Sequence, residues 1–350
     1  MISSITTGPS SRASNFELLR ILAMFFVLVV HADFAVLDPP TPDQLHAAPL
    51  NGATRILIEM FAIVSVNIFV LISGWFGIKA SLRGFTKLLF QVVFYSMAVY
   101  LFFTAFGSAP FTGEQIMANL LKVWVIQEWF VMSYMVLYVL SPILNAYVEN
   151  ASGRQLGGTI LAFYALQTLA SLFYESEQFV NGYSAISFVG LYLLARWLRL
   201  YGASLLRVST GLMCMLIPWL AASLAMFIII WNAVPNIAWH FLFYSNPLIV
   251  IEAVGYLILF ARIRPFVSRV VNLLSSGCFA VYLLHMNPWI YIHFKHFVAE
   301  QYTRLNGPVV ILAIGAFLVA FFLVSCIIDL LIRQPFWRAI SRCISVREKK

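Results

Sequence analysis

The sequence predicts an all-α integral membrane protein with about ten transmembrane helices. Of its 350 residues, 62% are hydrophobic and only 10% are charged, and the mean hydropathy is +0.89. Soluble domains carry about 25% charged residues, so lipid is the solvent that fits this composition. Backbone polar groups in lipid must pair internally, which restricts the spans to helices or a closed barrel. The apolar stretches run to about 20 residues without strict alternation, and this selects helices.

The spans follow one another along the chain with polar breaks between them. A polar, Ser/Thr-rich segment at residues 1–15 comes first, and we expect it to be flexible. The first span is too long for a signal peptide and lacks a cleavage site, so we expect it to be retained. Prolines mark a loop at 38–53, and 110–127 form another. The ten expected spans lie near 17–37, 54–78, 85–107, 129–148, 156–174, 184–201, 210–231, 241–261, 274–294 and 308–332.

The basic residues fall mainly on one side of these spans, which accounts for the net charge of +8 without a nucleic-acid partner. By the positive-inside rule, both termini are expected on the cytoplasmic side of the membrane. We therefore divide the chain into a cytoplasmic N-terminus (1–15), a membrane domain (16–333) and a basic cytoplasmic tail (334–350). The 18 basic residues on the cytoplasmic side are Arg12, Arg20, Lys79, Arg83, Lys87, Arg154, Arg196, Arg199, Arg207, Arg262, Arg264, Arg269, Arg333, Arg338, Arg342, Arg347, Lys349 and Lys350, out of 22 in the chain.

The first helix contains the densest set of ionisable residues: Glu17, Arg20, His31 and Asp33. Charged groups inside a span are costly and usually face the bundle interior. Arg20 and His31 are 11 residues apart, so they share one helix face, about 16 Å apart along the axis. Arg20 lies near the cytoplasmic end, where a cation can hold an anionic cofactor. His31 lies in the outer half, and imidazole suits general-base work because its pKa is near neutral.

Each of these residues also has a plainer explanation. Arg20 alone is equally well explained as a topology anchor whose charged end extends to the interface. His31 alone is equally well explained as a packed histidine bonded to a neighbouring helix. Asp33 is about 200° around the helix from His31, which makes it a poor direct partner.

Further polar and aromatic residues gather toward the outer half of the bundle. For the aromatic members, a place in the interfacial aromatic belt is the simpler interpretation. Glu252, in the eighth span, is a candidate partner for a buried cation. No zinc motif, P-loop, dinucleotide fingerprint or nucleophile elbow occurs, so we expect no metal. The candidates for binding an acceptor or orienting His31 are Glu128, Trp129, Asn67, Tyr244, Asn246 and His285.

Several segments together resemble the acyltransferase 3 family of multi-spanning membrane acyltransferases, particularly members that O-acetylate bacterial surface polysaccharides. The resemblance covers nearly the whole chain, and its most specific element is the spacing of Arg20 and His31. It rests on ELLRILAMFFVLVVH, FVLISGWFGIK, WFVMSYMVLYVLSP, NGYSAISFVGLYLLARWLRLY, FLFYSNPLIVIEAV and AVYLLHMNPW.

The resemblance implies a ten-helix fold, a cytoplasmic acyl-CoA donor, with acetyl-CoA expected, and an acceptor hydroxyl on a cell-surface or lipid-linked glycan. By this analogy His31 is catalytic and Arg20 helps to hold the donor. Family members often carry an Arg-rich motif at the third span, where this chain has Arg83 and Lys87 without a clear match. Arg199 is a further candidate for the donor phosphates, which favour Arg through charge-assisted bonds.

Two catalytic routes for His31 and two rival functions remain compatible with the sequence. His31 either removes the hydroxyl proton directly or carries the acyl group as an acyl-histidine. A glycan transporter or exporter without chemistry suits the span count equally, although neither an inverted repeat nor paired broken helices is evident. A structural membrane protein is disfavoured by the intramembrane charges. The acceptor sugar, the acyl length and the oligomeric state leave no mark in the sequence.

Overall fold

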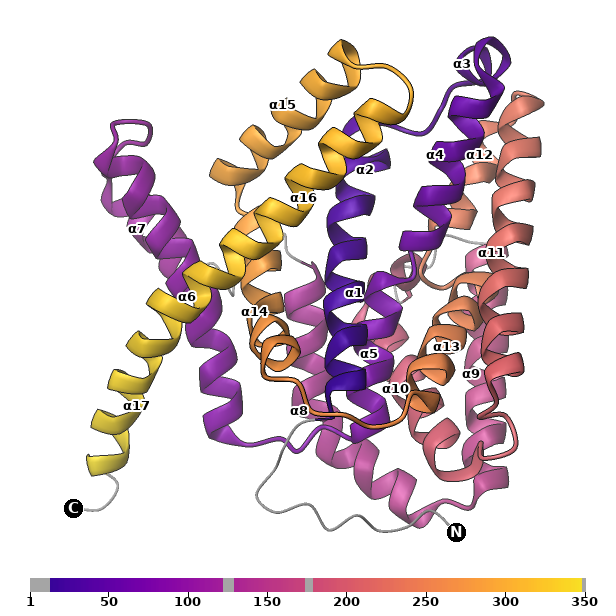
Figure 1. Cartoon of the computed structure of the whole chain (residues 1–350). Helices are drawn as coiled ribbons and strands as arrows, with labels where there is room; N and C mark the ends of the chain where they lie inside the picture. The colour runs from indigo at the N-terminus through magenta and orange to yellow at the C-terminus, as the bar shows by residue number, and fades with distance from the viewer. Residues whose placement is uncertain (1–12, 122–128, 174–178, 348–350) are drawn as a thin grey trace.

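A computed structural model describes residues 13–121, 129–173 and 179–347, and in these ranges the chain forms helices and no strand (Figure 1). The first half contains α1 (Ser14–Ala32), α2 (Phe34–Leu37), α3 (Pro42–Ala47), α4 (Pro49–Ala62), α5 (Ser65–Phe76), α6 (Leu82–Ala105), α7 (Gly113–Leu120), α8 (Trp129–Asn150) and α9 (Gly153–Phe173). The second half contains η1 (Val180–Gly182), α10 (Ala185–Tyr201), α11 (Val208–Trp231), α12 (Pro235–Ala238), η2 (Trp239–Leu242), α13 (Pro247–Arg262), α14 (Arg269–His285), α15 (Pro288–Arg304), α16 (Pro308–Ile328), the π-helical turn η3 (Asp329–Arg333) and α17 (Gln334–Arg347).

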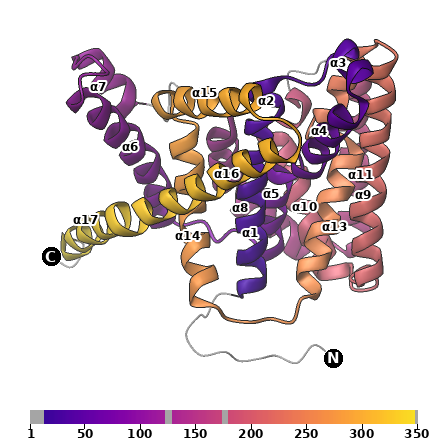
Figure 2. The same ribbon diagram turned by 45° about the horizontal axis from the view of Figure 1, so that its top comes forward.

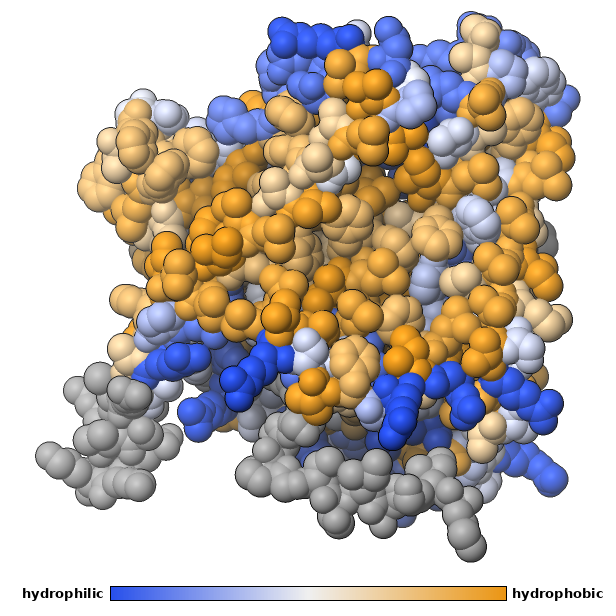
Figure 3. Space-filling view, viewed as in Figure 1, coloured by the Kyte–Doolittle hydropathy of each residue, from blue (hydrophilic) through white to orange (hydrophobic). Residues whose placement is uncertain are grey.

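The molecule has the surface of a multi-pass membrane protein. Hydrophobic side chains form a broad belt over the face shown in Figure 3, and hydrophilic residues gather above and below it. Seven helical segments in the described ranges are long and apolar enough to cross a membrane, or eight if one bent pair counts as a span. The predicted count of ten is therefore not confirmed. Helices α9 and α10 lie where spans were expected near 156–174 and 184–201, but they are not among the seven segments that are long and apolar enough to cross a membrane.

The ninth expected span, near 274–294, is not one straight helix. It is broken into α14 and α15, whose axes differ by 87°. The break follows from Asn287 and Pro288: the Asn287 side chain accepts a hydrogen bond from the backbone N–H of Trp289, and Pro288 takes the first position of the new helix. Asparagine caps and prolines at the first position are typical helix starts. As a result, α14 ends at His285, inside the molecule.

Helix α1 is the central element and packs against α4, α5, α13, α14 and α16. In both views of the ribbon it runs through the middle of the bundle (Figures 1 and 2). Its start and the end of α17 lie towards the same lower edge of Figure 1. Both ends of the fold therefore point the same way, while their placement in the cytoplasm stays a prediction.

Close packing of α5 on α10 depends on Gly74. A Cβ atom at this position would lie 2.5 Å from the carbonyl oxygen of Tyr192, a contact that real Cβ atoms essentially never make. Small residues allow helices to approach closely in membranes, where no hydrophobic force drives them together. This packing holds α5 in place, and three side chains of α5, those of Ser65, Phe69 and Ser73, line an internal cavity.

Candidate active site

A cavity of about 1340 Å³ follows the length of α1 through the interior. It is lined by Glu17 and Arg20 near the start of α1 and by His31 near its end. The 14 residues from Glu17 to His31 correspond to about 21 Å of helix. Arg20 and His31 therefore share a cavity-facing side of α1, as their spacing predicts, and their roles in binding and catalysis stay predictions.

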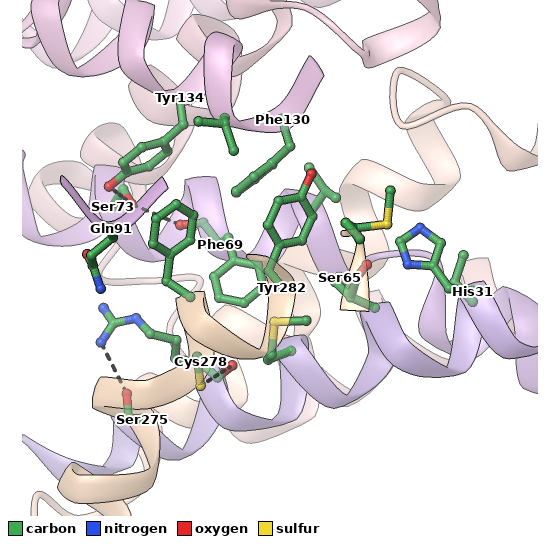
Figure 4. A pocket seen from close by; sticks show the side chains of 18 of the residues that line it. His31, Ser65, Phe69, Ser73, Gln91, Phe130, Tyr134, Ser275, Cys278 and Tyr282 are labelled. Atoms are coloured by element: carbon green, nitrogen blue, oxygen red, sulfur yellow. Dashed lines mark hydrogen bonds between the residues drawn. The ribbon is translucent and has the colours of Figure 1, made fainter. Parts of the chain in front are cut away.

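The middle of the cavity is aromatic. The rings of Phe69, Phe130 and Tyr282 lie between Ser275 at one end and His31 at the other (Figure 4). We call the two ends the arginine end, lined by Arg20, Lys87, Arg269, Arg333 and Arg338, and the histidine end, lined by His31, Glu59, Ser65, Trp129, Tyr183 and Tyr244.

His31 is paired with a second histidine. Its Nδ1 lies 2.6 Å from Nε2 of His285, which is fully buried at the end of α14. The Nδ1 atom of His285 lies 3.3 Å from the carbonyl oxygen of Val281. A carbonyl can only accept, so His285 Nδ1 carries the proton and its Nε2 is the acceptor in the neutral ring. His31 Nδ1 must then donate, which leaves a lone pair on His31 Nε2, the form that a general base requires.

At the arginine end, side chains from α1 and α14 hold one another in place. Arg20 forms an ion pair with Glu17, and its Nη1 is 3.5 Å from the hydroxyl oxygen of Ser275. Glu17 also accepts a hydrogen bond from Ser275. These contacts fix α1 against α14 and keep the Arg20 guanidinium at the cavity wall. Basic side chains from α6, α14, η3 and α17 share this end.

At the histidine end, buried polar atoms face a cluster of aromatic rings. Glu59 is 1% exposed, and its Oε2 has no hydrogen-bond partner among the described residues. Beside it, Arg55 donates to Asp33 over 2.7 Å, which ties the end of α1 to α4. Burial, with the nearby Glu59, raises the pKa of Tyr183 to about 12, so this phenol stays a neutral donor at pH 7.

The aromatic cluster consists of Trp129, Tyr183 and Tyr244. The Trp129 and Tyr183 ring centroids are 4.6 Å apart, and those of Tyr183 and Tyr244 are 4.7 Å apart. A largely apolar cavity with a few placed polar groups is the usual form of a small-molecule site.

The structure separates the residues predicted from sequence into two groups. Lys87, Trp129 and Tyr244 line the cavity with Arg20 and His31, and His285 lies behind His31. Four other predicted site residues, all within the described ranges, do not line the cavity: Arg83, Arg199, Asn67 and Asn246.

These four residues have other contacts or positions. Arg199 donates to the carbonyl of Trp75 over 2.8 Å, and Arg83 is exposed on α6. Asn67 is fully buried and donates to the carbonyl of Tyr244, and Asn246 caps α13. Glu128 lies outside the described residues.

Sequence reasoning missed Glu59, Ser65 and Arg333. Glu59 was visible as an acid inside the second expected span, where an ionisable residue by default suggests function. Ser65 and Arg333 gave no comparable signal, because a serine in a span or an arginine at the expected cytoplasmic end of a span is ordinary. Within the described residues, no group of three or more His, Cys, Asp or Glu side chains is arranged to hold a metal ion.

Comparison with known proteins gives one family match. The family model described as acyltransferase domain matches residues 14–330, nearly the whole chain and all of the cavity-lining part of α1 from Ser14 on. Searches of curated proteins and of solved structures gave no significant match.

Proposed function

The chain belongs to the acyltransferase domain family, and we propose that it transfers an acyl group, expected to be acetyl, from acyl-CoA to a hydroxyl of a cell-surface or lipid-linked glycan. The membrane acyltransferase activity follows from the family. The donor, the acceptor and the bacterial inner membrane belong to the proposal. The observation that supports it most is a single cavity with arginines at one end and a base-form histidine at the other.

The donor fits the arginine end. The phosphates of acyl-CoA are anionic, and guanidinium groups bind phosphate through charge-assisted hydrogen bonds. With the positive side of the protein in the cytoplasm, this end opens where acyl-CoA is found. The pantetheine arm then extends past Phe69, Phe130 and Tyr282, and the thioester reaches His31. Notably, the 14-residue distance along α1 calls for a long, thin, partly apolar ligand of this kind.

His31 acts in this proposal as the general base. Its Nε2 accepts the proton of the acceptor hydroxyl while the oxygen attacks the thioester carbonyl carbon. The C–S bond then breaks, the CoA sulfur leaves, and His31 returns the proton to it. His285 accepts the Nδ1–H of His31 throughout, which stabilises the positive charge that the ring gains. The route through an acyl-histidine uses the same atoms but is less favoured, since an imidazole held as base already activates the hydroxyl directly.

The acceptor fits the histidine end. Sugar rings present several hydroxyls together with apolar C–H faces. Glu59 and Ser65 offer buried polar atoms for the hydroxyls, and Trp129, Tyr183 and Tyr244 offer aromatic faces. A transporter without chemistry would have no need of a histidine held in one tautomer, so no observation favours that alternative.

Mass spectrometry of cell-surface glycans with and without this gene tests the proposal. We expect one glycan to lose an acyl mass in the deletion strain and to regain it with the wild-type gene. The His31→Ala gene, shown by immunoblot to be inserted normally, should not restore the acyl mass. Identical glycan spectra in all strains would contradict the proposed acceptor class.

A further inference from the structure

The cluster around η3 contains a buried ion pair that takes no part in the contact between His31 and His285 and includes none of the donor residues predicted from the sequence. Asp329 is 0% exposed and Arg333 is 3% exposed. Arg333 Nε donates to Asp329 Oδ1 over 2.7 Å, and Arg333 Nη2 donates to Asp329 Oδ2 over 2.6 Å. Removing two charges from water is costly, and a buried ion pair is weak evidence for stability alone. The pair therefore calls for a further reason.

Asp329 is surrounded by donors that hold it in one orientation. The Tyr95 hydroxyl donates to Oδ1 over 2.7 Å, and the Gln334 amide donates to Oδ2 over 2.9 Å. The same amide also donates to the hydroxyl of Ser276 on α14 over 3.1 Å. The carboxylate is thus tied to α6 and α14 as well as to its own chain segment. Its position in turn fixes the plane of the Arg333 guanidinium.

The backbone at this point is unusual. Residues Asp329–Arg333 form a π-helical turn between α16 and α17. Such turns are rare and occur frequently at functional sites. Arg333 lies on the wall of the same cavity as Arg20, despite being almost fully buried. Asp329 engages Nε and Nη2, so its carboxylate does not occupy Nη1, the atom through which Arg333 can donate to another acceptor.

The neighbours of Arg333 indicate the charge of that acceptor. Lys87, Arg269 and Arg338 line the same end of the cavity, so an anion meets several cations there. Trp337 also lines this end, and its ring lies 5.0 Å from the ring of Phe90 on α6. An anionic ligand with a flat ring system, such as a nucleotide, matches both features.

We propose that Arg333, held in place by Asp329, binds a phosphate of the nucleotide part of the donor, with α17 forming one wall of that subsite. The inference rests on the proposed function, because that function supplies the acyl-CoA. It assigns to the C-terminal helix a role in donor recognition. Arg20, already paired with Glu17, then lies farther along the path, between the phosphates and the thioester.

Binding of coenzyme A to the purified full-length protein in nanodiscs tests this assignment by titration calorimetry. The informative variant is the double substitution Asp329→Asn with Arg333→Gln, which removes both charges, keeps the net charge and leaves neither charge buried alone. We expect coenzyme A affinity to fall about 10- to 100-fold, the value of one hydrogen bond to a charged group. Binding should also become less sensitive to salt.

Two controls separate a phosphate contact from a general structural effect. Pantetheine, which lacks the phosphates, should bind the double variant and the wild type equally well. Arg304→Gln, on the exposed end of α15 where the side chain is 71% exposed, should leave coenzyme A affinity unchanged. If the double variant and the wild type bound coenzyme A with equal affinity, this inference would be overturned and the proposed function would stand. The same holds if the double variant lost affinity for pantetheine as well as for coenzyme A. A wild-type protein that binds no coenzyme A would instead contradict the proposed function itself.

Discussion

At the scale of single residues, the proposed chemistry depends on the contact between His31 and His285. Either histidine alone has an ordinary explanation as a packed polar residue in a span. Together they form a short hydrogen bond whose polarity is set by the carbonyl of Val281. The lone pair on the cavity-facing ring is a consequence of that chain of donors and acceptors.

Replacing His285 with leucine or glutamine tests this chain. Leucine cannot accept the Nδ1–H of His31, so we expect kcat to fall about 100-fold or more, within the range that general-base catalysis contributes. Glutamine offers a carbonyl oxygen as acceptor and should recover a large part of kcat. The KM for acyl-CoA should stay the same in both, because neither residue contacts the arginine end. Steady-state kinetics with labelled acyl-CoA measure these values, and a leucine variant with wild-type kcat would rule out the positioning role.

Glu59 supports a second prediction at this scale. Its unpartnered Oε2 at the histidine end is expected to bind a hydroxyl of the acceptor. Glu59→Gln should therefore raise the KM for the acceptor about 10-fold and leave coenzyme A affinity, measured by calorimetry, at the wild-type value. Glu300→Gln, an acid on α15 that does not line the cavity, is the matched control. A Glu59→Gln protein with weaker coenzyme A binding would show a role in folding or in donor binding instead.

At the scale of elements, helix breaks and close helix contacts position the site. The turn at Asn287 and Pro288 ends α14 at His285, where the second histidine meets the first. Because Gly74 has no Cβ, α5 can pack closely against α10, and this packing fixes the position of the cavity wall that α5 forms. Neither feature includes a candidate catalytic residue, yet both determine where the candidate residues lie.

Substitution of Gly74 by alanine tests the importance of this packing. A Cβ 2.5 Å from the Tyr192 carbonyl forces the helices apart, and overpacking of this kind typically costs about 1–3 kcal/mol. Thermal unfolding in detergent should show a lower melting temperature for Gly74→Ala. Gly315→Ala on α16, where a Cβ meets nothing within 4 Å, should leave the melting temperature unchanged or slightly higher. Equal melting temperatures for the two variants would show that α5 and α10 are not tightly packed here.

At the scale of the whole molecule, the sequence allows the membrane class and the cavity-facing stripe of α1 to be predicted, because both depend on local periodicity and composition. Arg20 and His31 were chosen for that reason, and both line the cavity. The bend after His285 was missed, since a long apolar run gives no sign that Pro288 starts a new helix direction. Arg333 was missed because its buried setting depends on Tyr95, which reaches the Asp329 partner of Arg333 only in the folded chain. Arg83 and Arg199 were chosen by sequence position, yet the cavity wall contains Arg269 and Arg338 instead.

In the proposed function, one continuous cavity connects a donor on one side of the membrane with an acceptor hydroxyl near His31. Inside-out membrane vesicles supplied externally with acetyl-CoA labelled in the acetyl group measure this most directly. We expect label on glycan enclosed in wild-type vesicles, and none in vesicles with normally inserted His31→Ala. Full labelling in the His31→Ala vesicles, or label that appears only when acetyl-CoA is enclosed inside them, would contradict it.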